Sequence, residues 1–388
     1  MRKPKTSLKI FRFAILIILY FPALAQVPGG NPPSIKWQQI NTPYSRVIFP
    51  RGFAAEANRI SYIINGIAEP TSITIGNKKK KINIVLQNQT TVSNGYVGLG
   101  PFRSEYFVTQ PQDNLGLGSF PWIDLLTIHE YRHVQQFNNF NVGLSKVMRD
   151  IFGEEGQALA NDAAIPNWFY EGDAVYNETN LSKQGRGSLP SFYNAYRSLW
   201  KDGRHYTWMK LRNGSLKDFI PDHYALGLLM VAYGHEKYGN EFWKNVTHDA
   251  ASFKSLFYPF QAAIKKYSGL DYKTFRNNAL DFFKKQFADT VINAPKENFK
   301  NEQFAYFTED GSLIYLNNSF KKIPTFQKKN GTGEKKIRAS DYTINDYFSY
   351  RNGKIVYASF KPDARWGYRD YSNIGVLDIA SGKQKSIT

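Results

Sequence analysis

Residues 127–134, which read Thr-Ile-His-Glu-Tyr-Arg-His-Val, decide the fold of this chain. Two histidines four residues apart lie one turn above each other on the same face of a helix, so both imidazoles can direct a nitrogen at one point. A divalent zinc ion fits that point. Glu130, which follows the first histidine, is too close to bind there, but it can reach a water molecule held at the point.

The residues around this stretch predict the helix that the geometry requires. Pro121 suits a first-turn position and Ser119 can cap the helix. Apolar residues supply the buried faces, with no Gly or Pro between them: Trp122, Leu125, Leu126, Ile128, Val134 and Phe137. The plain alternative is a helix that carries solvated His and Glu side chains without any chemistry. A third metal ligand elsewhere in the chain would weigh against it.

Residues 1–25 have the pattern of a secretory signal peptide. An apolar run, residues 13–21, is followed by Ala-Leu-Ala at 23–25. The basic leader consists of Arg2, Lys3, Lys5, Lys9 and Arg12. We therefore expect an exported protein, periplasmic, outer-membrane-associated or extracellular, with no transmembrane segment after cleavage. A retained membrane anchor is the weaker alternative, because the apolar run is short for a bilayer.

Charge and cysteine content limit the class of protein further. The sequence has no cysteine, so an exported chain must be held together by its core and any bound metal. Subtracting the five leader charges from the formal +18 leaves +13. The lysine runs at 78–81 and 335–336 fall in expected turns without a nucleic-acid-binding signature, so no nucleic acid partner is predicted. A solvated surface attracted to anionic envelope surfaces fits better.

The mature chain begins with a Pro/Gly-rich segment, residues 26–34, that we expect to be flexible. Residues 35–118 predict a sheet lobe, a small mixed sheet with one covering helix. Its expected elements are a strand at 46–49, a helix at 53–67, a hairpin of strands 72–75 and 81–86, and a strand at 106–108.

Residues 119–292 predict a helical lobe that begins with the histidine helix. Further helices are expected near 143–151, 166–180, 190–201, 222–238, 240–247, 253–267 and 271–288. The two lobes form residues 35–292, a predicted two-lobed α+β catalytic domain with a cleft between the lobes.

Residues 295–388 return to a strand pattern. Segments 304–316 and 351–359 share the order strand, glycine turn, strand, and 374–388 completes another hairpin. This part resembles TolB-like β-propeller repeats. It has room for about two blades, whereas propellers need about four to eight. The resemblance implies a partial β-propeller, with the chain a fragment of a longer protein or the other blades supplied from elsewhere.

Residues 167–176, Asn-Trp-Phe-Tyr-Glu-Gly-Asp-Ala-Val-Tyr, are the best source of a third ligand. They open a helix after Pro166, and Glu171 lies 38 residues after His133, enough for the chain to turn back. Asp173 or Glu178 could take its place, or could accept a hydrogen bond from a ligand histidine. Glu171 could also be an ordinary acid near a helix N-terminus.

With this segment the chain resembles the gluzincin superfamily of zinc peptidases, which includes thermolysin. Within it, some bacterial families carry Trp-x-x-Glu-Gly-x-Ala-x-Tyr after the His-Glu-x-x-His helix. The resemblance covers roughly residues 35–290. It implies a gluzincin-like fold in which His129, His133 and Glu171 hold Zn²⁺ and Glu130 is the general base.

The same resemblance extends to residues 222–227, Asp-His-Tyr-Ala-Leu-Gly. In the resembling families a Tyr or His of a later helix donates a hydrogen bond to the oxyanion, a role that falls on Tyr224 or its neighbour His223. Both could equally be plain core residues. No Gly-x-Met-Glu-Asn stretch is present, so an endopeptidase is expected rather than an aminopeptidase. The remaining histidines are expected at the surface: His205, His235 and His248.

These observations predict a zinc-dependent metallopeptidase that acts on peptide or protein substrates. In a second interpretation the propeller binds an envelope protein partner and the metal domain is a degenerate scaffold. In a third, the basic surface binds anionic polymers, an interaction that salt would weaken steeply.

Overall fold

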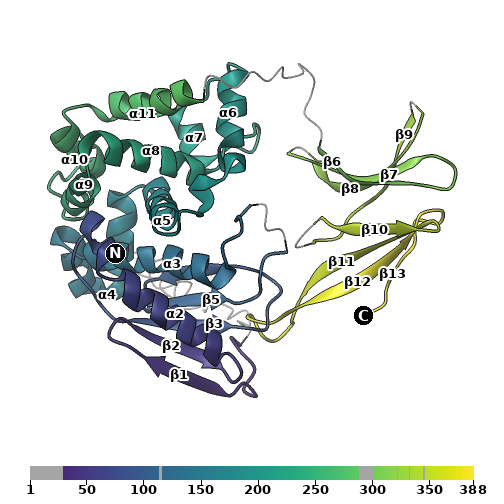
Figure 1. Ribbon diagram of the computed structural model, residues 1–388, viewed down its shortest axis with the longest axis horizontal. Coiled ribbons are helices and arrows are strands. Elements are labelled where there is room, and N and C mark those ends of the chain that lie inside the picture. The colour runs from purple at the N-terminus through teal and green to yellow at the C-terminus, as the bar shows by residue number, and fades with distance from the viewer. Residues whose placement is uncertain (1–28, 113–115, 288–300, 321, 332, 344–345) are drawn as a thin grey trace, which may run out of the picture.

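The computed structural model describes residues 29–112, 116–287 and 301–388, apart from 321, 332, 344 and 345. Figure 1 shows a sheet lobe, a helical lobe and, beside both, the C-terminal β-module, as we call the described part of residues 301–388. The chain is thus a mixed α+β structure with a helical bundle and several sheets. The predicted signal peptide, residues 1–25, lies outside the described residues.

The sheet lobe is built on a five-stranded mixed sheet of strand order β1-β2-β3-β5-β4. Strands β2, β3 and β5 are parallel, and β1 and β4 pair antiparallel at the two edges. Helix α2 (Ala54–Ile67) packs Ile60 and Ile64 against it, as the apolar spacing predicted. The strands are β1 (Trp37–Asn41), β2 (Ser45–Pro50), β3 (Ile82–Gln87), β4 (Gly95–Gly98) and β5 (Arg103–Phe107).

The predicted hairpin of strands 72–75 and 81–86 is wrong. Pro70–Thr74 is a 3-10 helix, η1, and β3 pairs in parallel with β2. The buried guanidinium of Arg132 donates to the Thr71 carbonyl at 2.7 Å and to the Thr74 hydroxyl at 2.8 Å. Because these bonds engage η1 with the histidine helix, the segment is drawn away from the sheet.

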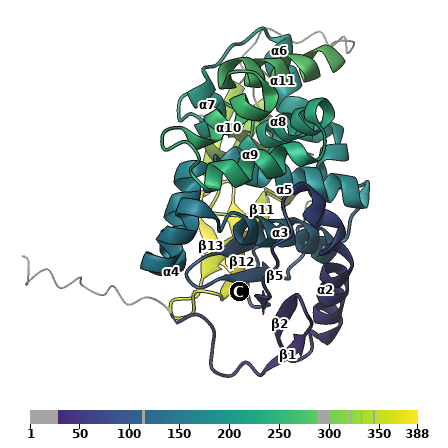
Figure 2. The ribbon, with the colours of Figure 1, turned by 90° about the vertical axis from the view of Figure 1, so that its left-hand side faces the viewer.

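The predicted histidine helix is confirmed as α3 (Trp122–Asn139). Leu126, Tyr131 and Val134 belong to the core of the sheet lobe. The predicted cap is wrong, since no side chain caps α3 and the Ser119 hydroxyl donates to Gln184 instead. Figures 1 and 2 agree that α3 and α5 lie next to each other, between the sheet and helices α6 to α11.

The helical lobe follows the predicted order with three differences. Helix α4 (Gly143–Ala164) continues past the predicted end at 151, through a non-helical Gly153 of φ +73°. A short helix, α7 (Trp208–Asn213), was not predicted, and α10 (Pro259–Ser268) begins later than expected, at its proline. The other helices are α5 (Asn167–Ser182), α6 (Asn194–Lys201), α8 (His223–Tyr238), α9 (Glu241–Ala251) and α11 (Tyr272–Gln286), with 3-10 turns η2 (Arg186–Ser188) and η3 (Pro190–Tyr193).

Helices α5 and α8 approach each other closely at two glycines. A Cβ added to Gly172 would collide with the backbone of Gly227, and one added to Gly227 would collide with the Trp168 carbonyl. Ala174 of α5 is also fully buried. Small residues therefore let α8 lie directly on α5, and large aromatic side chains fill the core around them: Trp168, Phe169, Trp243, Phe260 and Phe275.

The C-terminal β-module consists of two four-stranded antiparallel sheets, each with its strands in chain order. Buried side chains of both sheets, among them Leu316, Phe326 and Ile355, form one cluster. The described residues form no closed propeller, so the predicted propeller stays a prediction. The strands are β6 (Asn301–Phe307), β7 (Leu313–Ser319), β8 (Lys322–Asn330), β9 (Gly333–Ala339), β10 (Phe348–Arg351), β11 (Lys354–Pro362), β12 (Asp370–Asp378) and β13 (Gln384–Ser386).

The segment expected to be flexible, residues 26–34, is described from Gly29 onward. There, Gly29 and Gly30 accept backbone hydrogen bonds from Gly367 and Tyr368 of the module. Within the described residues, no helix combines the length and the apolar character that a membrane crossing requires.

Candidate metal centre

Helices α3 and α5 bring two imidazoles and one carboxylate together. The Nε2 atoms of His129 and His133 lie 3.3 Å apart. Glu171 Oε2 lies 3.3 Å from the first of these nitrogens and 3.5 Å from the second. These three side chains form a group that could hold a metal ion.

The donor atoms fit zinc in both type and spacing. Two imidazole nitrogens and a carboxylate oxygen are a ligand set of catalytic zinc sites, and ligands about 2.0–2.1 Å from a tetrahedral zinc stand roughly 3.3 Å from one another. The three separations of 3.3, 3.3 and 3.5 Å match that spacing. His129 and His133 are buried and Glu171 is partly buried, so the point between them is largely shielded from water.

Glu178 and Asp173, the alternative ligands, lie elsewhere. Glu178 Oε2 is 2.9 Å from Nδ1 of His129, the ring nitrogen opposite the one that faces Glu171. Asp173 pairs with the guanidinium of Arg132 through two bonds of 2.7 and 2.8 Å. Glu178 can therefore accept the Nδ1 proton of His129, an arrangement that orients a ligand histidine, and Arg186 Nη2 lies 2.8 Å from the same nitrogen.

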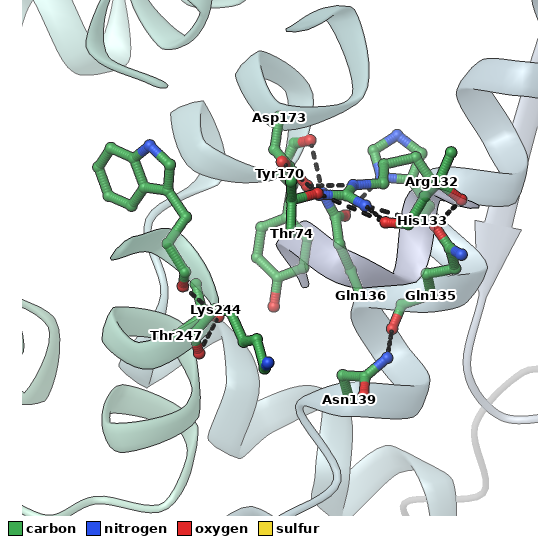
Figure 3. A network of polar contacts seen from close by, with 12 residues as sticks. Thr74, Arg132, His133, Gln135, Gln136, Asn139, Tyr170, Asp173, Lys244 and Thr247 are labelled. Carbon is green, nitrogen blue, oxygen red and sulfur yellow. Dashed lines mark hydrogen bonds and ion pairs between the residues drawn. The ribbon is translucent and has the colours of Figure 1, made fainter. Parts of the chain in front are cut away.

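A second polar network fixes His133, as Figure 3 shows. Its Nδ1 atom lies 2.8 Å from Gln136 Oε1. The amide nitrogen of Gln136 in turn donates to the Tyr170 carbonyl at 3.0 Å and to Asp173 at 2.8 Å. Because Tyr170 and Asp173 belong to α5, the network holds the second histidine in register with the helix that carries Glu171.

The charges of the site's own side chains favour a positive charge at its centre. Burial alone lowers the pKa of His133, but the charge of Glu171 and its hydrogen bond outweigh burial and raise the pKa to about 9. Burial raises the pKa of Glu171, yet the two histidines hold it well below its usual range. A carboxylate that stabilises protonated imidazoles is also placed to stabilise a bound cation.

Glu130 is 4% exposed, and its Oε2 atom has no hydrogen-bond partner among the described residues. Burial raises the pKa of this carboxyl. Gly95 of the edge strand β4 lies against it, because a Cβ on that glycine would stand 3.2 Å from both Cγ and Oε1 of Glu130. An unpaired buried carboxylate is costly, so its retention beside a metal-binding group suits a functional role.

Tyr224 and His223, at the start of α8, are placed differently. The ring of Tyr224 stacks near His129, with 6.3 Å between ring centroids, and its pKa is raised by burial and by Glu171. The side chain of His223 is 35% exposed and its Nδ1 lies 3.2 Å from Asp222. Tyr224 is thus the one of the two whose ring lies beside His129.

Arg186 belongs to the site but was not predicted. Its guanidinium pairs with Glu178 at 2.8 Å and lies over the ring of Tyr224, 5.3 Å from the centroid. The surrounding Gln-Gly-Arg-Gly sequence resembles an ordinary turn, and no spacing relates it to the histidine helix.

The expectation that His235 lies at the surface is wrong. This side chain is 7% exposed, its ring stacks on Tyr176 with 4.3 Å between centroids, and burial lowers its pKa to about 4. His205 and His248 are exposed, as predicted.

No protein-family model and no curated protein matches the chain. Among solved structures, it is similar to an M1 zinc metallopeptidase from Deinococcus radiodurans, with 13% identity, a TM-score of 0.34 and coverage of 67% of this chain and 53% of that one. A mutant two-domain M1 zinc metallopeptidase bound to L-tryptophan gives 12% identity, a TM-score of 0.33 and coverage of 67% and 52%. A mutant of a functionally unknown conserved protein from Bacillus anthracis str. Ames gives 13% identity and a TM-score of 0.30. The match covers 92% of this chain and 72% of that one.

This chain spans about half the length of the two metallopeptidases. TM-scores this low assign the chain to no family.

Proposed function

We propose that the chain is a zinc-dependent peptidase that hydrolyses peptide bonds within peptide or protein substrates. The observation that carries the proposal is the convergence of His129 Nε2, His133 Nε2 and Glu171 Oε2 beside the unpaired carboxylate of Glu130. A structural metal site would leave no reason for a buried acid without a partner next to it.

His129, His133 and Glu171 would hold the zinc. When bound there, zinc would act as a Lewis acid that acidifies water and polarises a carbonyl group. Glu130 takes the proton from the attacking water, since its charge interacts directly with those of His133, His129 and Glu171, and then delivers it to the leaving amine. Tyr224 donates a hydrogen bond to the oxygen on which negative charge develops.

The edge strand β4 supports a peptide substrate. Among the described residues β4 pairs with β5 alone, so its other edge can pair with an extended chain. Gly95 of this strand lies against Glu130. A peptide that added to β4 as a further strand would therefore run past the general base, and side-chain pockets would matter less than main-chain hydrogen bonds. A strand-like mode of binding fits cleavage within a chain.

The first test is to purify the chain, measure zinc per protein, and assay casein hydrolysis with and without a chelator. We expect about one zinc per chain and a loss of hydrolysis on chelation that added zinc restores. Glu130→Gln should abolish turnover and keep the metal, whereas Glu236→Gln, at an exposed position of α8, should change neither. Hydrolysis by the Glu130→Gln protein would exclude the mechanism.

We also propose that the chain is exported, on the basis of the signal-peptide pattern of residues 1–25. Expression of the full chain in a bacterial host, followed by N-terminal sequencing of the secreted or periplasmic product, tests this. A product that starts at Gln26 is expected, and a product that keeps residues 1–25 would contradict it.

A further inference from the structure

We propose that the C-terminal β-module is a wall across one side of the metal site that admits extended peptide segments and excludes folded proteins. This inference rests on the proposed peptidase function and names its substrate class. It is drawn from the contacts that the module makes with both lobes.

The first contact joins the module to the sheet lobe through Asp370, the first residue of β12. Its carboxylate accepts hydrogen bonds from the Thr90 hydroxyl at 2.5 Å, from the Thr91 amide at 2.6 Å and from the Thr91 hydroxyl at 2.5 Å. Its backbone amide donates to the Gln89 carbonyl at 3.0 Å. Four bonds to one short segment fix the module in a defined position.

Tyr368 adds a contact at the edge of the sheet. Its hydroxyl donates to Glu105 at 2.8 Å and lies 3.2 Å from the hydroxyl of Tyr96 in β4. Glu105 is 3% exposed and also accepts from Arg103 and Gln87. The module thus completes a buried polar network, which costs free energy if one partner is withdrawn.

This contact lies one residue away from the catalytic side of β4. Successive side chains of a strand point to opposite faces of the sheet. Gly95 faces α3 and the Glu130 carboxylate, whereas Tyr96 faces Tyr368 of the module. The module therefore covers the other face of the very strand whose free edge borders the site.

A separate contact joins the module to the helical lobe. Phe320, between β7 and β8, meets Phe219 edge to face, with 6.2 Å between ring centroids. Phe219 lies five residues before Tyr224, in the segment that leads into α8. One anchor is thus one residue along β4 from the contact with Glu130, and the other lies five residues before Tyr224 in the sequence.

With both anchors in place, the module spans from the sheet lobe to the helical lobe beside the site, and Figure 1 shows it at one side of both. A folded substrate would have to displace it in order to reach the metal group. An extended segment would not, because a single strand needs only about 4.7–4.9 Å beside β4.

The contact itself is tested first. The chain has no cysteine, so Phe219→Cys with Phe320→Cys introduces a unique pair. These two side chains are 59% and 51% exposed, so their replacement should not disturb a core. We expect a short reversible bis-thiol cross-linker to join them within one molecule, and neither single variant to react in this way. Absence of the cross-link in the zinc-loaded protein would overturn the inference.

The selectivity is tested with a triple variant, Tyr368→Phe and Asp370→Ala combined with Phe320→Ala, which removes the side-chain bonds to the sheet lobe and the ring contact to the helical lobe. The matched control is Asp310→Ala with Phe307→Ala, because the partners of Asp310 among the described residues all belong to the module and Phe307 is 77% exposed. Each protein is assayed on a short quenched-fluorescent peptide and on the same sequence placed in a loop of a stable folded domain. Small-angle scattering reports whether the module has moved away.

We expect the anchor variant to become more extended and to cleave the folded substrate several-fold faster, with peptide hydrolysis and zinc content unchanged. The control and the cross-linked protein should stay selective for the peptide. If the more extended variant keeps the same ratio of folded-substrate cleavage to peptide cleavage, the module does not exclude folded proteins and the inference is overturned. Loss of hydrolysis on both substrates in every zinc-loaded protein would contradict the proposed peptidase function instead.

Discussion

At the scale of single residues, the site depends on which carboxylate faces the Nε2 atoms of His129 and His133. Within the described residues, Glu171 supplies the one carboxylate that is grouped with these two nitrogens, so zinc content should fall sharply in Glu171→Ala. Glu178→Gln keeps all three donors but weakens the acceptor of the His129 Nδ1 proton, so zinc affinity should fall by roughly 10–100-fold. Elemental analysis and zinc titration measure both.

The reverse order, with zinc unchanged in Glu171→Ala and lost in Glu178→Gln, would move the ligand assignment to Glu178. Asp173 has no part in this comparison, since both of its oxygens bond to Arg132.

The raised pKa of His133, about 9 in the metal-free site, predicts a pH dependence of stability. A histidine of raised pKa stabilises the fold fully below its unfolded value of about 6.5, and that contribution is lost as the pH rises toward about 9. The pKa of His129 is raised too, so it acts in the same direction. The melting temperature of chelator-treated protein should therefore fall between these pH values.

His133→Gln should flatten this decline, because glutamine does not titrate. Saturating zinc should reverse it, since metal binding displaces protons and strengthens as the pH rises. Melting curves at a series of pH values, with and without zinc, measure both, and an equal decline in the zinc-loaded protein would contradict the assignment.

Part of the site was predictable at this scale. A helix fixes the relation between His129, Glu130 and His133, so their spacing predicted one shared face. The aromatic and small residues around Glu171 marked a second buried helix. Arg186 could not be found in this way, because its place at the site comes from η2, a short 3-10 turn after α5 that has no periodicity.

At the scale of elements, the crossing of α5 and α8 depends on Gly172. Gly172→Ala should force the two helices apart, because the added Cβ meets the backbone of Gly227, and should cost about 1–3 kcal/mol of unfolding free energy. It should also lower zinc affinity, since Glu171 is the preceding residue. Denaturant unfolding and zinc titration measure the two effects.

Gly66 in α2 provides the matched control. It is exposed, and a Cβ there would have nothing within 4 Å. Gly66→Ala should stabilise the protein by about 0.5–1 kcal/mol through helix propensity. A Gly172→Ala protein as stable as Gly66→Ala would show that α5 and α8 can separate without cost.

The buried pair of Arg132 and Asp173 joins α3 to α5, with side chains 1% and 0% exposed. Asp173→Asn leaves the guanidinium without its counter-charge and should destabilise the protein by about 3–5 kcal/mol. The double change Arg132→Met with Asp173→Leu should recover much of the loss, since it leaves no buried charge. A double variant no more stable than the single one, by chemical denaturation, would contradict this account.

Arg132 also explains why the hairpin predicted from the sequence at residues 72–75 and 81–86 was wrong. Residues 72–75 are apolar and β-branched enough to suggest a strand, and the glycine after them suggested a hairpin turn. The hydrogen bonds that join η1 to the histidine helix come from Arg132, about sixty residues away, so no local pattern could reveal them. The pairing of β3 with β2 in parallel is likewise a long-range choice.

At the scale of the whole molecule, the order of sheet lobe, helical lobe and C-terminal β-module was predictable, because each has its own periodicity of apolar residues. The position of the module relative to the two lobes was not predictable. Asp370 and Thr90 are far apart in the sequence, and both read as ordinary loop residues. Contacts of this kind depend on the shape of surfaces that exist only after each part has folded.

The three donor atoms stand on helices that belong to different hydrophobic cores. Helix α3 contributes to the core of the sheet lobe, whereas Tyr170, next to Glu171, belongs to that of the helical lobe. A cation held between them would therefore link the core of the sheet lobe to the core of the helical lobe. Metal binding should then slow amide hydrogen exchange in α3 and α5 together. The exchange rate of these two helices would therefore report whether the ion is bound.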